Sequence, residues 1–103
     1  MTPLDRAIFI CGSQSELVRR INGKPATGYV YHWRRNGITG QVAVDIERAV
    51  RAAIAESEDA AIRAGIDGPV TVEQLLPSLE WQRDEAGSVI GFLTPVAQQA
   101  GAG

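Results

Sequence analysis

Residues 13–35 read SQSELVRRINGKPATGYVYHWRR, and this stretch predicts two short helices joined by a turn. Ser13 can cap the first helix, and Glu16, three residues later, would complete a capping box. The segment 22–26 contains an asparagine, a glycine and a proline, which interrupt a helical pattern. A second helix is therefore predicted over residues 27–35.

The second predicted helix separates apolar from polar side chains. Val30 and Trp33 lie at helical spacing and predict its buried face. The residues left for its other faces are Tyr29, Tyr31, His32, Arg34 and Arg35. Between residues 17 and 35 there are five Lys or Arg residues and no Asp or Glu. A basic helix-turn-helix of this kind is typical of proteins that read DNA.

The length and composition predict one folded domain that needs no cofactor or metal. With 103 residues, of which 45% are hydrophobic, the chain can bury a core. Cys11 is the only cysteine, which excludes an internal disulfide and a cysteine-only metal cluster. No signal peptide is apparent, and no run approaches the ~20 apolar residues of a membrane span. We expect a soluble, cytoplasmic protein with no membrane partner.

Charge is divided unevenly along the chain. Residues 1–51 carry eight Lys or Arg against four Asp or Glu, a net charge of +4. Residues 52–103 carry two against eight, a net charge of −6. A basic binding face joined to an acidic, solubilising half would produce this asymmetry. The alternative is that the surface charges came to be distributed in this way by chance, without a function.

Three further helices are predicted around the basic stretch. Thr2 can cap the first, Thr39 a long one and Thr71 a short one. We expect the long helix to continue to Ala64 because alanine has the highest helix propensity, and its alanine-rich end could pair with a copy. A break and restart at Ser57 is the alternative.

The last part of the chain predicts a β-hairpin and a tail. β-Branched and aromatic residues on both sides of the turn 84–87 favour two strands. Because an isolated hairpin is only marginally stable in water, we expect it to pack on the helices or pair with another subunit. The chain is thus divided into a helix-turn-helix domain (1–79), a hairpin extension for packing or dimerisation (80–95) and a disordered tail (96–103).

Four segments of the chain are informative when taken together. In order, they are LDRAIFICGSQSELVRRI from residue 4, YVYHWRRNGIT from residue 29, VDIERAV from residue 44 and VTVEQLLPSLEW from residue 70. This order of segments resembles the YdaS-type, Cro-like helix-turn-helix regulators of phages and prophages. The resemblance implies a mainly α, Cro/CI-like bundle of four to five helices, to which this chain adds the C-terminal β-hairpin. The turn at 22–26 is longer than is usual in the family.

The resemblance also implies which residues contact DNA. A glutamine at the position of Gln14 typically contacts the DNA backbone and supports the recognition helix. Residues that open this helix or face outward from it would approach the base edges, namely Thr27, Gly28, Tyr31 and His32. Phosphates would be held by Arg20, Lys24, Arg34 and Arg35.

The expected function is sequence-specific binding to double-stranded DNA as a transcriptional regulator, a repressor by its resemblance. A homodimer would then bind a partly palindromic operator. The alternative is an antitoxin-like or adaptor protein that binds a protein partner through the acidic C-terminal half. The chain has no nucleophile with an evident base, no phosphate loop and no metal-ligand spacing, so we do not expect an enzyme.

Overall fold

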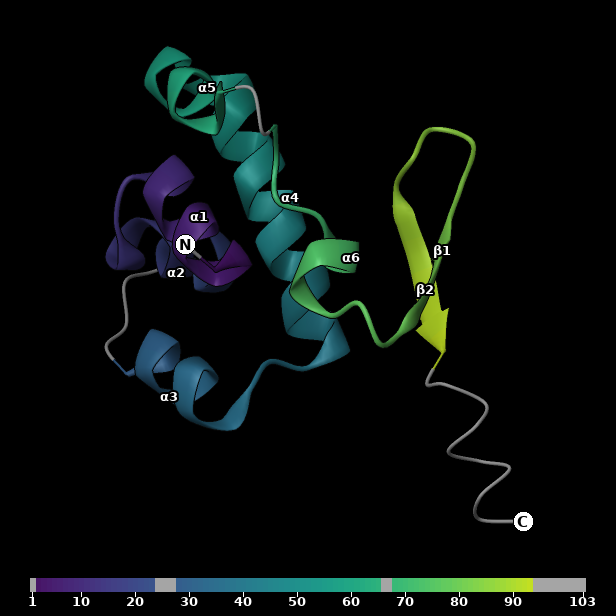
Figure 1. Cartoon of the computed structure of the whole chain (residues 1–103). Coiled ribbons are helices and arrows are strands. Elements are labelled where there is room, and N and C mark those ends of the chain that lie inside the picture. The colour runs from purple at the N-terminus through teal and green to yellow at the C-terminus, as the bar shows by residue number, and fades with distance from the viewer. Residues whose placement is uncertain (1, 24–27, 66–67, 94–103) are drawn as a thin grey trace, which may run out of the picture.

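The computed structural model describes residues 2–23, 28–65 and 68–93, and this part of the chain is mainly helical (Figure 1). It contains one more helix than the upper end of the expected four to five, together with one antiparallel hairpin. The helices are α1 (Pro3–Cys11), α2 (Gln14–Asn22), α3 (Tyr29–Asn36), α4 (Gly40–Glu56), α5 (Glu58–Ala64) and α6 (Val72–Leu75). The strands are β1 (Glu80–Arg83) and β2 (Val89–Leu93). None of the described helices is long and apolar enough to cross a membrane.

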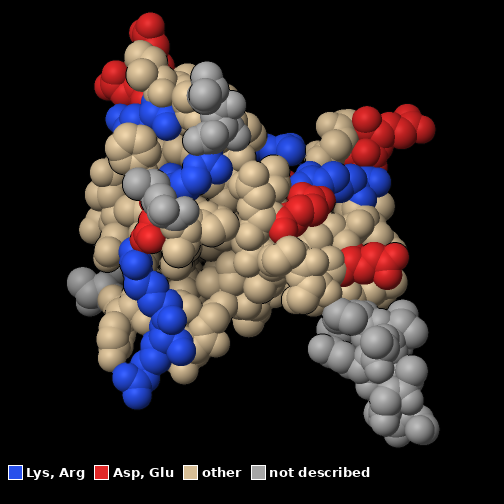
Figure 2. Space-filling view, viewed as in Figure 1, with Lys and Arg blue, Asp and Glu red and all other residues tan. Residues whose placement is uncertain are grey.

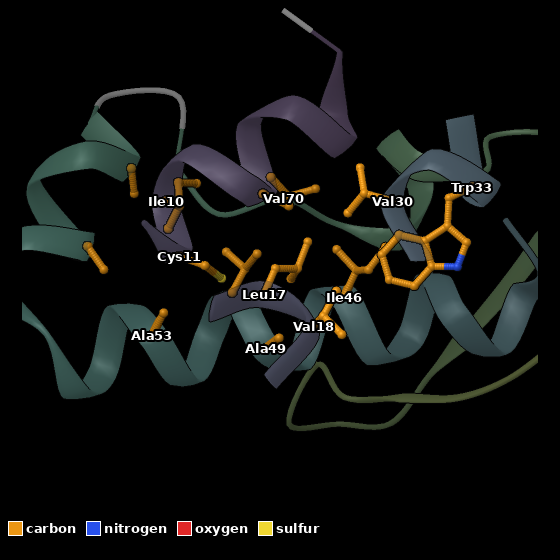
Figure 3. Packing of buried hydrophobic residues seen from close by; sticks show 14 residues of the cluster. Ile10, Cys11, Leu17, Val18, Val30, Trp33, Ile46, Ala49, Ala53 and Val70 are labelled. Carbon is orange, nitrogen blue, oxygen red and sulfur yellow. The ribbon is translucent and has the colours of Figure 1, made fainter. Parts of the chain in front are cut away.

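Helix α4 is the central element, and α1, α2, α5 and α6 all pack on it. One face of α4 is fully buried at Ile46 and Val50, which belong to one apolar cluster with side chains of the surrounding helices. Figure 3 shows Ile46 among these side chains. Cys11 lies in the same cluster, and burial raises the pKa of its thiol to about 11. Cys11 is therefore a small residue of the core.

Four helices begin at the predicted capping residues. The hydroxyls of Thr2, Ser13, Thr39 and Thr71 each accept a hydrogen bond from a backbone N–H of the first turn. At Ser13 the donor is the N–H of Glu16, 3.0 Å away, but the Glu16 carboxylate accepts from Arg19. The cap at Ser13 is thus confirmed, while Glu16 binds the next turn of its own helix.

The long helix does not continue to Ala64, so that prediction was wrong and the alternative break at Ser57 is correct. Ser57 has an extended backbone, and its hydroxyl accepts from the N–H of Ala60 to start α5. Helix α5 turns back onto α1, where the Arg63 guanidinium donates to the carbonyl of Ile10 at 3.0 Å. These contacts bury two alanines of α5, so the alanine-rich segment does not protrude as a pairing helix.

The hairpin packs on the helices of its own chain. Trp81 pairs with Phe92 across the strands, and their ring centroids lie 5.1 Å apart. The Trp81 indole N–H donates to the carbonyl of Leu76 at 2.9 Å. A second buried cluster joins the hairpin to α4 and α6, and its buried members are Ala43, Val44, Val72 and Val89. Residues 80–93 therefore share a core with the helical part, whereas the predicted tail, 96–103, lies outside the described residues.

An ion cluster also joins the hairpin to α4. Glu47 is 2% exposed and accepts hydrogen bonds from the backbone N–H of Val72 (3.0 Å) and from Arg83 of β1 (2.7 Å). Arg83 bridges onward to Glu73 at 2.7 Å, and its hydrogen bond lowers the pKa of that carboxyl. A buried carboxylate is tolerated when such partners satisfy it. Glu47 thus fixes β1 and α6 on one side of α4.

A glycine at the start of α4 allows the hairpin to approach closely. The ring of Phe92 lies directly over Gly40 and occupies the space that a methyl group would need.

Helix propensity alone would make Gly40→Ala stabilising by up to ~1 kcal/mol. We expect the overlap to prevail and the free energy of unfolding, measured in urea, to fall by ~1–3 kcal/mol. The same substitution in a Phe92→Ala background should lose this penalty. An unchanged or increased stability in the wild-type background would contradict the prediction.

Candidate nucleic-acid interface

Helix α3 is anchored by the two residues predicted to be its buried face. Val30 is 4% exposed and Trp33 is 8% exposed. Figure 3 shows the Trp33 ring lying next to Ile46 of α4, with Val18 of α2 beside it. Tyr29 packs its ring against Trp33, with the centroids 6.0 Å apart. These contacts leave the opposite side of α3 exposed.

The helix begins later than predicted. Its first residue is Tyr29, and Gly28 is the N-cap, with a left-handed backbone (φ 91°) and no side-chain hydrogen bond. A residue with a β-carbon would be strained there, which accounts for the glycine. Thr27 was expected to cap this helix and Lys24 to hold phosphate, but both lie outside the described residues.

The exposed face of α3 carries two side-chain pairs, each spaced by one helical turn. The Arg35 guanidinium donates to the hydroxyl of Tyr31 at 3.2 Å. The Asn36 amide nitrogen lies 3.1 Å from Nδ1 of His32. Three of these residues were predicted as DNA contacts, whereas Asn36 lies beyond residue 35, where the predicted helix ends. Its spacing of four residues from His32 could have placed it on the same face.

The arginines predicted to hold phosphates differ in their surroundings. Arg34 is turned towards α1 and bonds the Asp5 carboxylate, with about half of its side chain exposed. Arg20 bonds Glu56 of α4 at 2.6 Å, and its side chain is only 16% exposed. Within the described ranges, Arg35 has no carboxylate within 4.0 Å.

These surroundings change the expected roles of two arginines. Arg20 joins α2 to α4, and this burial counts against the phosphate contact expected of it. Arg34 helps to fix α3 on α1. Arg35 is the α3 cation whose only bonded side-chain partner in the described chain is a neutral hydroxyl.

The first turn of α2 completes the candidate interface. Gln14 and Ser15 are exposed there, directly after the capping residue Ser13. The N-terminus of a helix carries partial positive charge and unpaired N–H groups, which suit a phosphate. Figure 2 shows Arg side chains over α3, whereas the Asp and Glu side chains of this view lie mainly over α5 and around the hairpin, where Arg side chains are present as well. On this face of the molecule the acidic residues thus lie mainly away from α3.

The titration of Asp5 tests how α3 is held. A hydrogen bond from the Thr2 hydroxyl, and then the hydrogen bond and charge of Arg34, hold the pKa of Asp5 below its usual 3.8. We expect Arg34→Ala to raise this pKa only part of the way, because the larger contribution of Thr2 remains. Carboxyl NMR titration measures the change.

The same titration has a consequence for stability. Because the folded-state pKa is lowered, the contribution of ionised Asp5 is fully present above pH 3.8 and is lost as the pH falls through the folded-state value. Asp5→Asn should remove this part of the pH dependence of unfolding. A wild-type Asp5 that titrates at or above 3.8 would contradict the assignment.

No protein-family model, curated protein or solved structure matches this chain. Its candidate interface is therefore defined by its own residues. Gln14 lies at the start of α2, and the α3 face is formed by Tyr31, His32, Arg35 and Asn36. This surface combines hydrogen-bonding side chains with positive charge on a helix that is anchored from behind.

Proposed function

We propose that the chain binds double-stranded DNA sequence-specifically, as a Cro-like transcriptional regulator that acts as a repressor, with α3 in the major groove. The observation that carries the proposal is the division of α3 into two faces. Val30 and Trp33 fix the helix to the core, while the outward face offers polar side chains and no acid. A side chain can discriminate between bases only if its backbone is held in place, and this anchoring supplies that condition.

The size and chemistry of α3 suit this role. Eight residues span about 12 Å, comparable to the ~12 Å width of the major groove. The Asn36 amide can form a bidentate pair with adenine, and Arg35 can do so with guanine or hold a phosphate. The Tyr31 ring can contact a thymine methyl, and His32 offers a ring nitrogen to a base edge. The chemistry of these four residues therefore favours base recognition over a purely electrostatic contact.

The DNA backbone would be held by groups around α3. Gln14 and the N–H groups at the start of α2 are donors for one phosphate. Lys24 precedes α3 in the sequence and stays in the proposal as a further phosphate contact. One helix reads only a few base pairs, so we propose a two-fold dimer with half-sites ~34 Å apart on a partly palindromic operator.

A protein-binding adaptor is the second candidate function. It is favoured by exposed apolar side chains in the acidic half of the chain, where Ile62 is 68%, Ile90 66% and Leu93 50% exposed. Isolated apolar residues are common on protein surfaces and need no partner. The α3 face offers more specific chemistry, and for this reason DNA binding is the leading proposal.

Selection of bound sequences from a random DNA pool tests the proposal. We expect a partly palindromic motif, bound with an affinity that falls steeply as salt concentration rises. Enrichment of an asymmetric motif would contradict the two-fold dimer. Failure to enrich any motif at low salt would contradict sequence-specific binding and favour the adaptor.

Substitutions on α3 separate base recognition from phosphate binding. His32→Ala and Tyr31→Ala should each change the preference at one or two base pairs of the selected motif, because each side chain reaches a base edge. Arg35→Ala should weaken binding to all sequences about equally and reduce the salt slope by about one, if Arg35 holds a phosphate. Binding is measured by fluorescence anisotropy on a panel of single-base variants.

Ile62→Ala, on the remote helix α5, is the control expected to leave DNA binding unchanged. An equal loss on every sequence for all three α3 variants would contradict base reading.

A further inference from the structure

A stripe of side chains on α4 faces away from the core and remains uncovered. Its members recur at intervals of four, three and four residues and are Gln41, Asp45, Arg48 and Ala52. Gln41, Arg48 and Ala52 are exposed and Asp45 is half-buried. The opposite face of α4 contains the fully buried Ile46 and Val50. A spacing of this kind keeps the four side chains in one line and is the spacing with which helices pack on one another.

The stripe lies between two grooves. On the α2 side, a groove of about 420 Å³ is lined by Arg20, Asp45, Arg48 and Ala52, among others. On the hairpin side, a groove of about 150 Å³ is lined by Gln41, Val44, Arg48 and Ile90, among others. Arg48 borders both grooves, so the stripe forms a ridge between them. A ridge with a groove on each side is a shape that a second helix can fit.

The two charged residues of the stripe are available to a partner. Their spacing of three residues would permit an ion pair within the helix. Asp45 instead accepts a hydrogen bond from the Gln41 amide at 3.1 Å. Among the described residues, neither Asp45 nor Arg48 forms an ion pair within 4.0 Å. The surface thus carries one carboxylate and one guanidinium side by side, both without a charged partner.

We propose that this stripe is the interface with a second copy of the chain, with the two α4 helices antiparallel. A two-fold axis that passes between Asp45 and Arg48 places each of them opposite the other residue of the second copy, which gives two ion pairs. The same axis sets Gln41 opposite Ala52, so that a long side chain meets a small one. A parallel pairing would place Arg48 against Arg48 and is opposed by repulsion. The charge pattern therefore selects the antiparallel arrangement.

The hairpin adds apolar contact to this interface. Exposed ion pairs contribute little to affinity, and their main effect here is to set the register of the two helices. Ile90 is 66% exposed and lines the groove beside residues 41–48, which is the level of the proposed axis. The axis brings the Ile90 side chains of the two copies to the same edge of the interface. Burying these side chains supplies a favourable contribution that the ion pairs lack.

The inference deepens the proposed function, on which it rests for the expectation of a dimer. Figure 1 shows α2 and α3 on one side of α4 and the hairpin on the other. A two-fold axis that runs across α4, from one of these sides to the other, leaves α2 and α3 of both copies on the same side of the paired helices. The hairpins then lie on the other side. Two recognition helices on one side of a dimer are what a palindromic site requires.

A charge exchange tests the interface in the absence of DNA. Sedimentation equilibrium of the full chain should show a monomer–dimer equilibrium. Asp45→Arg or Arg48→Asp alone places like charges opposite each other and should weaken dimerisation at least tenfold. The double variant Asp45→Arg/Arg48→Asp restores opposite charges across the axis and should recover most of the wild-type affinity. Circular dichroism checks that each variant is folded.

Two further variants complete the test. Glu85→Arg, in the exposed hairpin turn, makes the same change in net charge as Asp45→Arg and should leave dimerisation unchanged. Ile90→Ser should weaken the dimer. A wild-type chain that stays monomeric overturns the inference, as does a double variant no better than the single ones. Because the experiment contains no DNA, a dimer with these properties would support the proposed interface even if no operator were found. A monomer that binds DNA would contradict the proposed interface but not DNA binding.

Discussion

The packing of α1, α2 and α3 against the buried face of α4 is the constraint on which the structure depends. Ile46 is fully buried at the centre of this contact, and a buried side chain of its size contributes ~1.5–3 kcal/mol by leaving water. Trp33 brings α3 to the same point, so that α3 and the core share one anchor. The orientation of the candidate interface is therefore set by hydrophobic packing, and its polar face is left exposed.

Another side of α4 holds the hairpin by a different means. There, the buried Glu47 carboxylate accepts hydrogen bonds from the N–H of Val72 and from Arg83. The ring of Phe92 also packs over Gly40. A hairpin is marginal alone, and these contacts supply the tertiary support it needs. The single long helix is thus shared between the helices that hold α3 and the hairpin, which explains why the two are not separate domains in the described chain.

Local features of the fold could be predicted from the sequence, and features set by distant contacts could not. The caps at Thr2, Ser13, Thr39 and Thr71 depend on a few neighbouring residues, and so does the turn of the hairpin. The break at Ser57 depends on the packing of α5 against α1, because the helix propensity of the alanines favours a continuous helix.

The same distinction applies to the candidate site. Helical spacing identified Val30 and Trp33 as buried and Tyr31 and His32 as exposed. It could not show that Arg20 is bound by Glu56, since thirty-six residues separate them. Asn36 was missed as a member of this face because the predicted helix ended at residue 35, one residue too early. Sequence patterns thus define which face a residue occupies, while ion pairs between helices require the assembled fold.

The ion pair between Asp5 and Arg34 has a consequence for the thermodynamics of any complex with a polyanion. If a phosphate replaced Asp5 as the partner of Arg34, a counterion would be released from the nucleic acid. The unpaired Asp5 carboxylate would then lie close to the phosphate backbone. That carboxylate attracts cations of its own, and their uptake offsets the release. The number of ions exchanged would then follow the net charge of the surface rather than its number of arginines. In such a complex, the acid on α1 would moderate the attraction between a basic helix and a polyanion of any sequence.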